Sequence, residues 1–184
     1  MKPFILLASI LLPSHCFASQ QWSALNNHQS IQFTTSYDEV AFNGVFKKYT
    51  STISIDPQQL NNSFVRSNID VTSIDTKSHD RDQALAEPDW FYFSNFPQAT
   101  FDSTNISLIE KNHYRVTGIL KIRDQEKKIT FPLEWRIVND NHAHANAQFA
   151  LDRRDFNIGL GEWAEDETIG FSVNVTISMD YETK

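Results

Sequence analysis

Cysteine, glycine and long apolar runs are scarce in this sequence. The only cysteine is Cys16, near the N-terminus, and glycine occurs 5 times in 184 residues. Cys16 lies within an N-terminal segment that we expect to be cleaved off, as argued below. Without it, the mature chain can form no disulfide and has no thiolate for catalysis. Beyond the N-terminal segment, no apolar stretch is long enough for a transmembrane helix. Stability must therefore come from a hydrophobic core, and the remaining length suffices for one domain.

Positive charge is also in short supply. Lysine and arginine total 16 against 23 aspartate and glutamate residues, which gives a formal net charge of -7 at pH 7. A negatively charged protein repels phosphate backbones and anionic lipid surfaces, so nucleic acid binding and electrostatic docking to a membrane are disfavoured. Any lipid that the protein handles must be held by shape and apolar contact.

The first residues have the layout of a secretory signal peptide. Lys2 precedes an apolar run over residues 4–12, and the small residue Ala18 ends the segment. The run is too short to span a bilayer as a stop-transfer helix. We therefore expect cleavage after Ala18 and a periplasmic protein, with residues 1–18 as signal peptide and residues 19–184 as one mature domain.

What the sequence has in abundance is strict alternation of apolar and polar residues. The clearest case is the last segment, 171–181, and the same period of two recurs over 129–137 and 114–122. Such segments are strands with one apolar and one polar face, and their apolar faces must be buried together. The sequence therefore predicts an all-β protein, either two packed sheets or a closed barrel.

One helix and further short strands complete the predicted arrangement. Ser78 is a suitable N-cap and Pro88 a stop, which predicts a helix over 78–87. The remaining strands are expected over residues 31–33, 40–55 with a bulge or bend at Gly44, 65–71, 97–101, 113–124, 127–139, 142–151 and 170–182. Gly159, Gly161 and Gly170 bracket a loop that we expect to be mobile.

The interior of such a protein could be filled or hollow. Its many aromatic residues can simply form a core. A barrel of about eight strands, however, is wide enough to hold one ligand, and strands of about ten residues at ~3.3 Å each give a cavity roughly 30 Å long. That length suits an extended hydrocarbon chain, but composition alone permits this interpretation without selecting it.

The order of motifs resembles the YceI-like family, secreted lipocalin-like proteins that bind polyisoprenoids. The matching pieces are SIQF at 30–33, FNGVFKKY at 42–49, TSIDT at 72–76, RDQAL at 81–85, DWFYFSNFPQATF at 89–101, HYRVTGILKI at 113–122, LDRRDFNIG at 151–159 and the final strand. The resemblance implies an antiparallel lipocalin-like extended β-barrel around a long apolar channel. The ligand it implies is the isoprenoid tail of a quinone or another polyprenyl compound, with no covalent cofactor.

Two features depart from that pattern. Many relatives have a histidine after the first strand, where this chain has Tyr37. The loop over 159–170, which contains GEW, resembles a subgroup associated with membrane b-type cytochromes, so such a cytochrome is a candidate partner.

Aromatic and apolar residues on inward-facing positions are the candidate ligand contacts. The parity of its strand places Trp135 inside, and we expect it to be a better channel residue than Trp163, whose glycine-flanked loop suggests a rim or lid. The same parity describes core and channel residues equally. The full candidate set is Phe33, Phe46, Arg81, Trp90, Phe91, Phe93, Phe96, Phe101, Trp135, Phe149, Trp163, Phe171 and Val173.

Two residues of the predicted helix have alternative roles. Arg81 either donates hydrogen bonds to a ligand headgroup at the barrel mouth or fixes the helix to the barrel. For Asp82 we favour the second role.

Catalytic and metal-binding patterns are weak. His142 and His144 point the same way on a strand but lack further ligands at a defined spacing, so a solvated loop is favoured over a metal site. The acids Glu162, Glu165, Asp166 and Glu167 fit no calcium loop and are expected on a charged surface. The sequence has no nucleophile elbow, phosphate loop or dinucleotide fingerprint. A carrier is thus favoured over two alternatives, a small enzyme that uses the acidic loop or residues 79–82, and an interaction module with a filled core.

Overall fold

The computed structural model describes residues 20–25, 31–164 and 168–183. Its strands are β1 (Trp22–Ala24), β2 (Ile31–Tyr37), β3 (Val40–Phe46), β4 (Tyr49–Ser54), β5 (Phe64–Asp70), β6 (Ile74–Asp75), β7 (Gln98–Glu110), β8 (His113–Ile122), β9 (Gln125–Asn139), β10 (His142–Asp152) and β11 (Ser172–Thr183). The helices are α1 (His79–Leu85) and the short 3-10 helices η1 (Leu60–Asn62), η2 (Val71–Ser73), η3 (Arg153–Phe156) and η4 (Gly161–Ala164).

The strands close into an antiparallel barrel. In the described part of the chain the order is β1-β4-β5-β7-β8-β9-β10-β11, and β1 pairs with β11 to complete a ring of eight strands. The N-terminal half of β11 pairs instead with β2, which continues the sheet through β3 to β6. This confirms the predicted all-β fold with a barrel of about eight strands and one helix.

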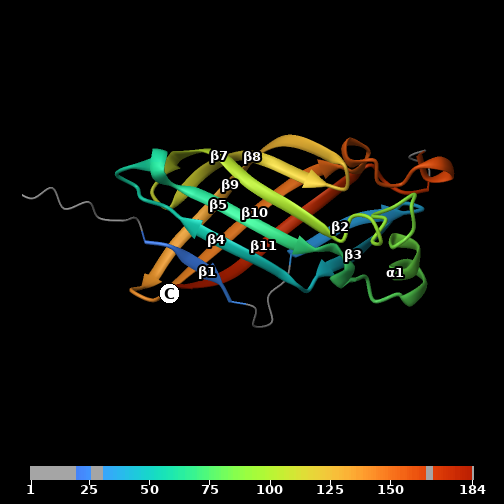
Figure 1. The fold of residues 1–184 in the computed structure, drawn as a ribbon, viewed down its shortest axis with the longest axis horizontal. Coiled ribbons are helices and arrows are strands. Elements are labelled where there is room, and N and C mark those ends of the chain that lie inside the picture. Colours follow the sequence, from blue (N-terminus) through green and yellow to red (C-terminus); the bar gives the residue numbers. More distant parts are fainter. Residues whose placement is uncertain (1–19, 26–30, 165–167, 184) are drawn as a thin grey trace, which may run out of the picture.

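The two ends of the barrel differ. Helix α1 and the loop after β10 gather at one end, together with the hairpin of β2 and β3, whereas β1 and the C-terminus lie at the other end (Figure 1). We call the first end the mouth and the second the base. The connections at the base include the tight hairpins β7–β8 and β9–β10 and the longer β4–β5 connection that contains η1, whereas α1 and the loop after β10 lie at the mouth.

The predicted alternation decides which side chains face inward. On β8 the residues Tyr114, Val116 and Leu120 are buried, and on β9 the same holds for Phe131 and Leu133. Gly118 continues the inward phase of β8, and the alternate residues of both strands face outward, as the period of two requires. The apolar phase of the sequence therefore forms the barrel interior.

Several boundaries differ from the sequence-based expectation. The stretch 40–55 is two strands, β3 and β4, separated at Lys47 and Lys48 because the chain leaves one sheet neighbour and joins another. Strand β7 is 13 residues long and extends well past Phe101. Helix α1 has 7 residues and is shorter than the predicted 78–87, although Ser78 is its N-cap as expected.

The structure has no β-bulge at Gly44, one of the two features considered for this position. Pairing between β2 and β3 runs in register from Ile31 opposite Phe46 to Tyr37 opposite Val40. A Cβ atom on Gly44 would lie 2.2 Å from Cζ of Phe33. Glycine is needed here because the ring of Phe33 lies directly on the backbone of the neighbouring strand.

Candidate ligand channel

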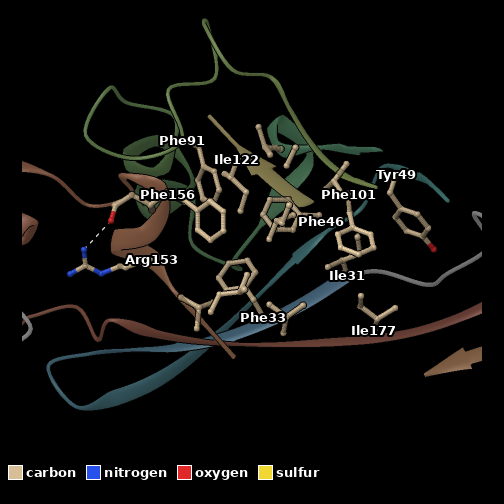
Figure 2. Close-up of a pocket in the computed structure, with 18 of the residues that line it drawn as sticks. Ile31, Phe33, Phe46, Tyr49, Phe91, Phe101, Ile122, Arg153, Phe156 and Ile177 are labelled. Atoms are coloured by element: carbon tan, nitrogen blue, oxygen red, sulfur yellow. Dashed lines mark hydrogen bonds between the residues drawn. The ribbon is translucent and has the colours of Figure 1, made fainter. Parts of the chain in front are cut away.

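A cavity of about 590 Å³ fills the interior of the barrel. A volume of this size lies in the range of pockets that enclose small organic ligands. Side chains from strands all around the barrel line it, and most of them are aliphatic or aromatic. Figure 2 shows Phe33, Phe46 and Phe101 turned into this space. The barrel is hollow rather than filled.

Polar side chains in the wall gather at its two ends. At the mouth they are Thr35, Tyr37, Ser78, Asp80, Arg81 and Arg153. Towards the base they are Tyr49, Ser51, Ser67 and Tyr181. Between them lies an apolar tunnel, which can remove a hydrocarbon chain from water but can make few polar contacts with it.

Most of the aromatic residues singled out from the sequence do line the cavity. Trp163 is among them, and its ring lies 5.8 Å from that of Trp90 between centroids, at the mouth. The lining members of the candidate set are Phe33, Phe46, Arg81, Trp90, Phe91, Phe101, Phe149, Trp163 and Val173.

Trp135 lies outside the wall, contrary to the expectation that it is a better channel residue than Trp163. Its ring makes edge contacts with Trp22 at 5.7 Å and with Tyr181 at 5.3 Å between centroids. These three rings fill the base of the barrel. Strand parity gave the correct face for Trp135, but it contains no information about depth along the barrel axis.

Three other candidates also lie outside the wall. Phe171 is covered by Arg154, whose guanidinium carbon lies 3.6 Å from the ring centroid. Phe93 and Phe96 belong to the segment between α1 and β7, where Phe93 contacts Phe91 and Phe96 contacts Tyr92. These three rings pack against neighbouring side chains at the mouth, and none of them lines the channel.

Sequence reasoning missed the small residues that create the free volume. Ala99, Ala145 and Ala147 line the cavity and are buried, so the wall recedes where they lie. The alternating alanines of β10 were a readable signal, because small side chains at successive inward positions leave space inside a barrel. The hydroxyl residues near the base were also missed.

Helix α1 is fastened to the barrel through Thr76. The Asp82 carboxylate accepts hydrogen bonds from the Thr76 backbone N–H at 2.9 Å and from its hydroxyl at 2.7 Å. Arg81 donates from Nε to the same hydroxyl at 2.9 Å, and its guanidinium lies 4.3 Å from the centroid of the Phe42 ring. The structural role favoured for Asp82 is thus confirmed, and Arg81 shares it while also lining the mouth.

The loop after β10 is organised by a buried arginine. Arg153 is 3% exposed and donates hydrogen bonds to backbone carbonyl oxygens on both sides of the loop. The acceptors are Ile158, Gly159, Trp163, Ile169 and Gly170. A Cβ atom on Gly159 would lie 2.5 Å from Nη1 of Arg153, so glycine is required there. The described residues on either side of this loop, which we expected to be mobile, are hydrogen-bonded to one buried guanidinium.

The two histidines considered as metal ligands lie on β10, not in a solvated loop. Nδ1 of His144 is 2.6 Å from Oδ1 of Asp180, and Nε2 of His142 is 3.2 Å from the same atom. These contacts, with the hydrogen bond from His144 first, hold the pKa of Asp180 below its usual value. Among the described residues, no group of three or more His, Cys, Asp or Glu side chains is placed to hold a metal ion.

The described groups considered for catalysis form no catalytic arrangement, because Arg81 and Asp82 are engaged with Thr76. His79 and Asp80 are exposed on α1, and Glu162 is exposed in η4. Glu165, Asp166 and Glu167 lie outside the described residues. In the described part of the chain, no helix has the length and apolar character needed to cross a membrane.

Comparison with known proteins fits this geometry. The chain is 30% identical over 128 residues to a UPF0312 protein of Shewanella denitrificans, covering 68% of this chain and 67% of that one. The crystal structure of BcnA from Burkholderia cenocepacia superposes with a TM-score of 0.80 at 26% identity, covering 85% of this chain and 98% of BcnA. A domain from Saccharophagus degradans, described as polyisoprenoid-binding and implicated in plant cell wall breakdown, shares the fold with a TM-score of 0.71 at 14% identity, covering 89% of this chain and 98% of that domain.

The barrel, its tunnel and the order of motifs thus agree with a sequence profile that matches residues 22–181, nearly the whole described chain. The protein belongs to the family of YceI-like domains.

Proposed function

We propose that this protein is a carrier that binds the isoprenoid tail of a lipid inside its barrel. The observation that carries the proposal is the continuous apolar cavity of about 590 Å³ at the centre of the barrel. Each methylene moved from water into such a space contributes about 0.8 kcal/mol, so several isoprene units bind without any charged contact. The structural neighbour described as a polyisoprenoid-binding domain supports the same class of ligand.

The wall suits a binding protein better than an enzyme. Its charged residues are Asp80, Arg81 and Arg153, and all of them lie at the mouth. Arg153 is fully engaged with loop carbonyls, and Arg81 donates to Thr76. The described residues in the middle of the channel offer no acid, base or nucleophile to a bound chain, and storage or transfer of an intact lipid requires an inert wall of this kind.

The physiological setting that we propose is based on the signal peptide expected over residues 1–18 and on the channel. The protein would act in the periplasm after cleavage behind Ala18, where a hydrophobic tail needs shelter from water. An isoprenoid quinone or a related polyprenyl lipid is the ligand we favour, and a membrane b-type cytochrome is a suitable donor or acceptor of a quinone.

Native mass spectrometry of the mature protein isolated from its own periplasm tests this proposal. We expect a mass excess that solvent extraction releases as a prenyl lipid. Delipidated protein should then rebind an added prenyl quinone, which can be followed by quenching of the fluorescence of Trp90 and Trp163 at the mouth. Protein that carries no hydrophobic passenger and binds no added prenyl lipid would contradict the proposal.

A further inference from the structure

Four hydroxyl groups lie together in the wall towards the base of the channel. Tyr49 and Ser51 are on β4, Ser67 is on β5 and Tyr181 is on β11, and all four line the cavity. In Figure 2, Tyr49 lies at the opposite end of the cavity from Arg153 and Phe156. We call these residues the hydroxyl cluster.

The hydroxyl cluster has more donors than it can use internally. The Tyr181 hydroxyl donates to Oγ of Ser51 at 2.8 Å, and the Oγ atoms of Ser51 and Ser67 are 2.8 Å apart. Two hydrogen bonds therefore join three hydroxyl groups. With the Tyr181 O–H directed to Ser51, one serine O–H remains without an acceptor among the described residues, whichever serine donates to the other. The alternative acceptor for Tyr181 is Sδ of Met179 at 3.8 Å, and a thioether sulfur accepts only weakly.

Tyr49 is a further unpaired donor beside these three, with a hydroxyl oxygen that is itself buried rather than open to the channel. Its side chain is 4% exposed, and its hydroxyl has no hydrogen-bond partner among the described residues. An unpaired buried hydroxyl costs about 1–3 kcal/mol, so native proteins normally supply a partner. Ser67 is the member of the cluster that is partly accessible inside the barrel, so it is the group that an oxygen atom in the channel can reach first.

The charges around the cluster exclude an anionic partner. Among the described residues the charged side chains of the wall are all at the mouth, so none of them is a cation at this end that could neutralise a phosphate. Burial raises the pKa of both Tyr49 and Tyr181, and the negative charge of Asp180 behind the wall raises that of Tyr49 further. An uncharged oxygen that accepts a hydrogen bond is compatible with this environment, whereas an anion would be desolvated without compensation.

We infer that the hydroxyl cluster binds the uncharged oxygen-bearing end of a prenyl lipid, such as an alcohol or a quinone carbonyl, so that the lipid lies oxygen end towards the base and tail end towards α1. Ser67 donates the hydrogen bond from the position most accessible to the channel. This inference rests on the proposed function and adds the polarity class and the direction of the ligand to it.

The test compares two ligands of equal chain length in delipidated mature protein. Hexaprenol and squalene have the same number of isoprene units, but only hexaprenol ends in a hydroxyl group. We expect Ser67→Ala to weaken hexaprenol binding by roughly threefold to tenfold, the net value of one neutral hydrogen bond, and to leave squalene binding unchanged. Displacement of a fluorescent prenyl probe measures both affinities.

Two further variants make the outcome decisive. Ser172→Ala is the matched control, because Ser172 lies exposed on β11 and outside the wall, and it should change neither affinity. Arg81→Gln tests the opposite orientation at the mouth. If Arg81→Gln and not Ser67→Ala selectively weakens hexaprenol, or if Ser67→Ala changes both ligands equally or neither, the inference is overturned while the carrier function stands. If the unaltered protein binds neither ligand, the proposed function falls as well.

Discussion

Arg153 organises the loop at the mouth by donating hydrogen bonds to five backbone carbonyl groups. Its guanidinium reaches backbone carbonyls that are far apart along the loop after β10, so it replaces the regular hydrogen bonding that a loop lacks. A charged donor is suited to this task because each of its hydrogen bonds is stronger than a neutral one. Trp163 and Ile169 reach the channel wall because the backbone around them is fixed in this way.

Replacing this side chain should therefore destabilise the whole protein. We expect Arg153→Met to lower the free energy of unfolding by about 3 kcal/mol or more, because several buried carbonyls lose their donors. Urea denaturation measures the change. Arg154→Met is the matched control, since Arg154 is exposed and pairs with Asp152, and its cost should stay below about 1 kcal/mol. Equal losses in the two variants would contradict the role given to Arg153.

Asp180 gives a prediction for pH. Its pKa is lowered in the folded state, chiefly by the hydrogen bond with His144, so its contribution to stability is present above the unfolded value near 3.9. That contribution is lost as the pH falls through the lowered folded-state pKa. We expect Asp180→Asn to be less stable than the unaltered protein by about 1 kcal/mol or less at about pH 6.

The difference between the two proteins should shrink as the pH falls below about 4, because the carboxyl group then becomes neutral in both states. Thermal denaturation across the pH range gives the comparison. A difference that stays constant down to about pH 2 would show that Asp180 acts through shape and not through charge.

At the scale of elements, α1 is too short to be stable by itself. A helix of 7 residues gains little from its own hydrogen bonds and depends on its N-cap and on tertiary contacts. Here Ser78 accepts from the Arg81 backbone N–H, and Asp82 holds buried Thr76 beside β6. The element that covers the mouth is therefore attached at a few identifiable points.

Removal of one such point should loosen α1 selectively. We expect Asp82→Ala to raise hydrogen exchange over residues 79–85 by about tenfold or more, because two hydrogen bonds to Thr76 are lost. Hydrogen exchange read by mass spectrometry resolves this segment from the barrel strands. Gln83→Ala on the exposed side of the same helix should leave exchange unchanged. If exchange in α1 is insensitive to Asp82, another contact holds the helix.

At the scale of the whole molecule, the channel exists because the barrel is closed and its inward alanines are small. Ala147 lies on β10 opposite Leu133 and Ile177, in the wall of the channel. A large side chain at this position enters free space, so it should cost little of the stability that overpacking a filled core would cost.

We expect Ala147→Trp to reduce prenyl-lipid binding by about a hundredfold or more while the protein stays folded, because the ring occupies the volume that the tail needs. Lipid retention after purification and circular dichroism are the two measurements. Ala150→Trp is the matched control, because Ala150 is exposed on the outer face of the same strand. Normal lipid retention in Ala147→Trp would show that the tail lies elsewhere.

The sequence by itself determined the strand parity, the single α-helix with its Ser78 cap and the all-β class, whereas the choice of a barrel over two packed sheets came from the resemblance to the YceI-like family. Alternation with a period of two is a local property, so it can be read along one strand without knowing its neighbours. That is why β8, β9 and β11 were correctly oriented, and why Phe33 and Phe101 were correctly expected inside.

Only the tertiary structure decided how far along the barrel each inward residue lies and whether the centre is hollow. Trp135 and Phe131 share one face of β9, yet one fills the base and the other lines the channel, because depth depends on the stagger of strands distant in sequence. For the same reason Tyr49, Ser51, Ser67 and Tyr181 look unrelated along the chain and meet only after the barrel has closed.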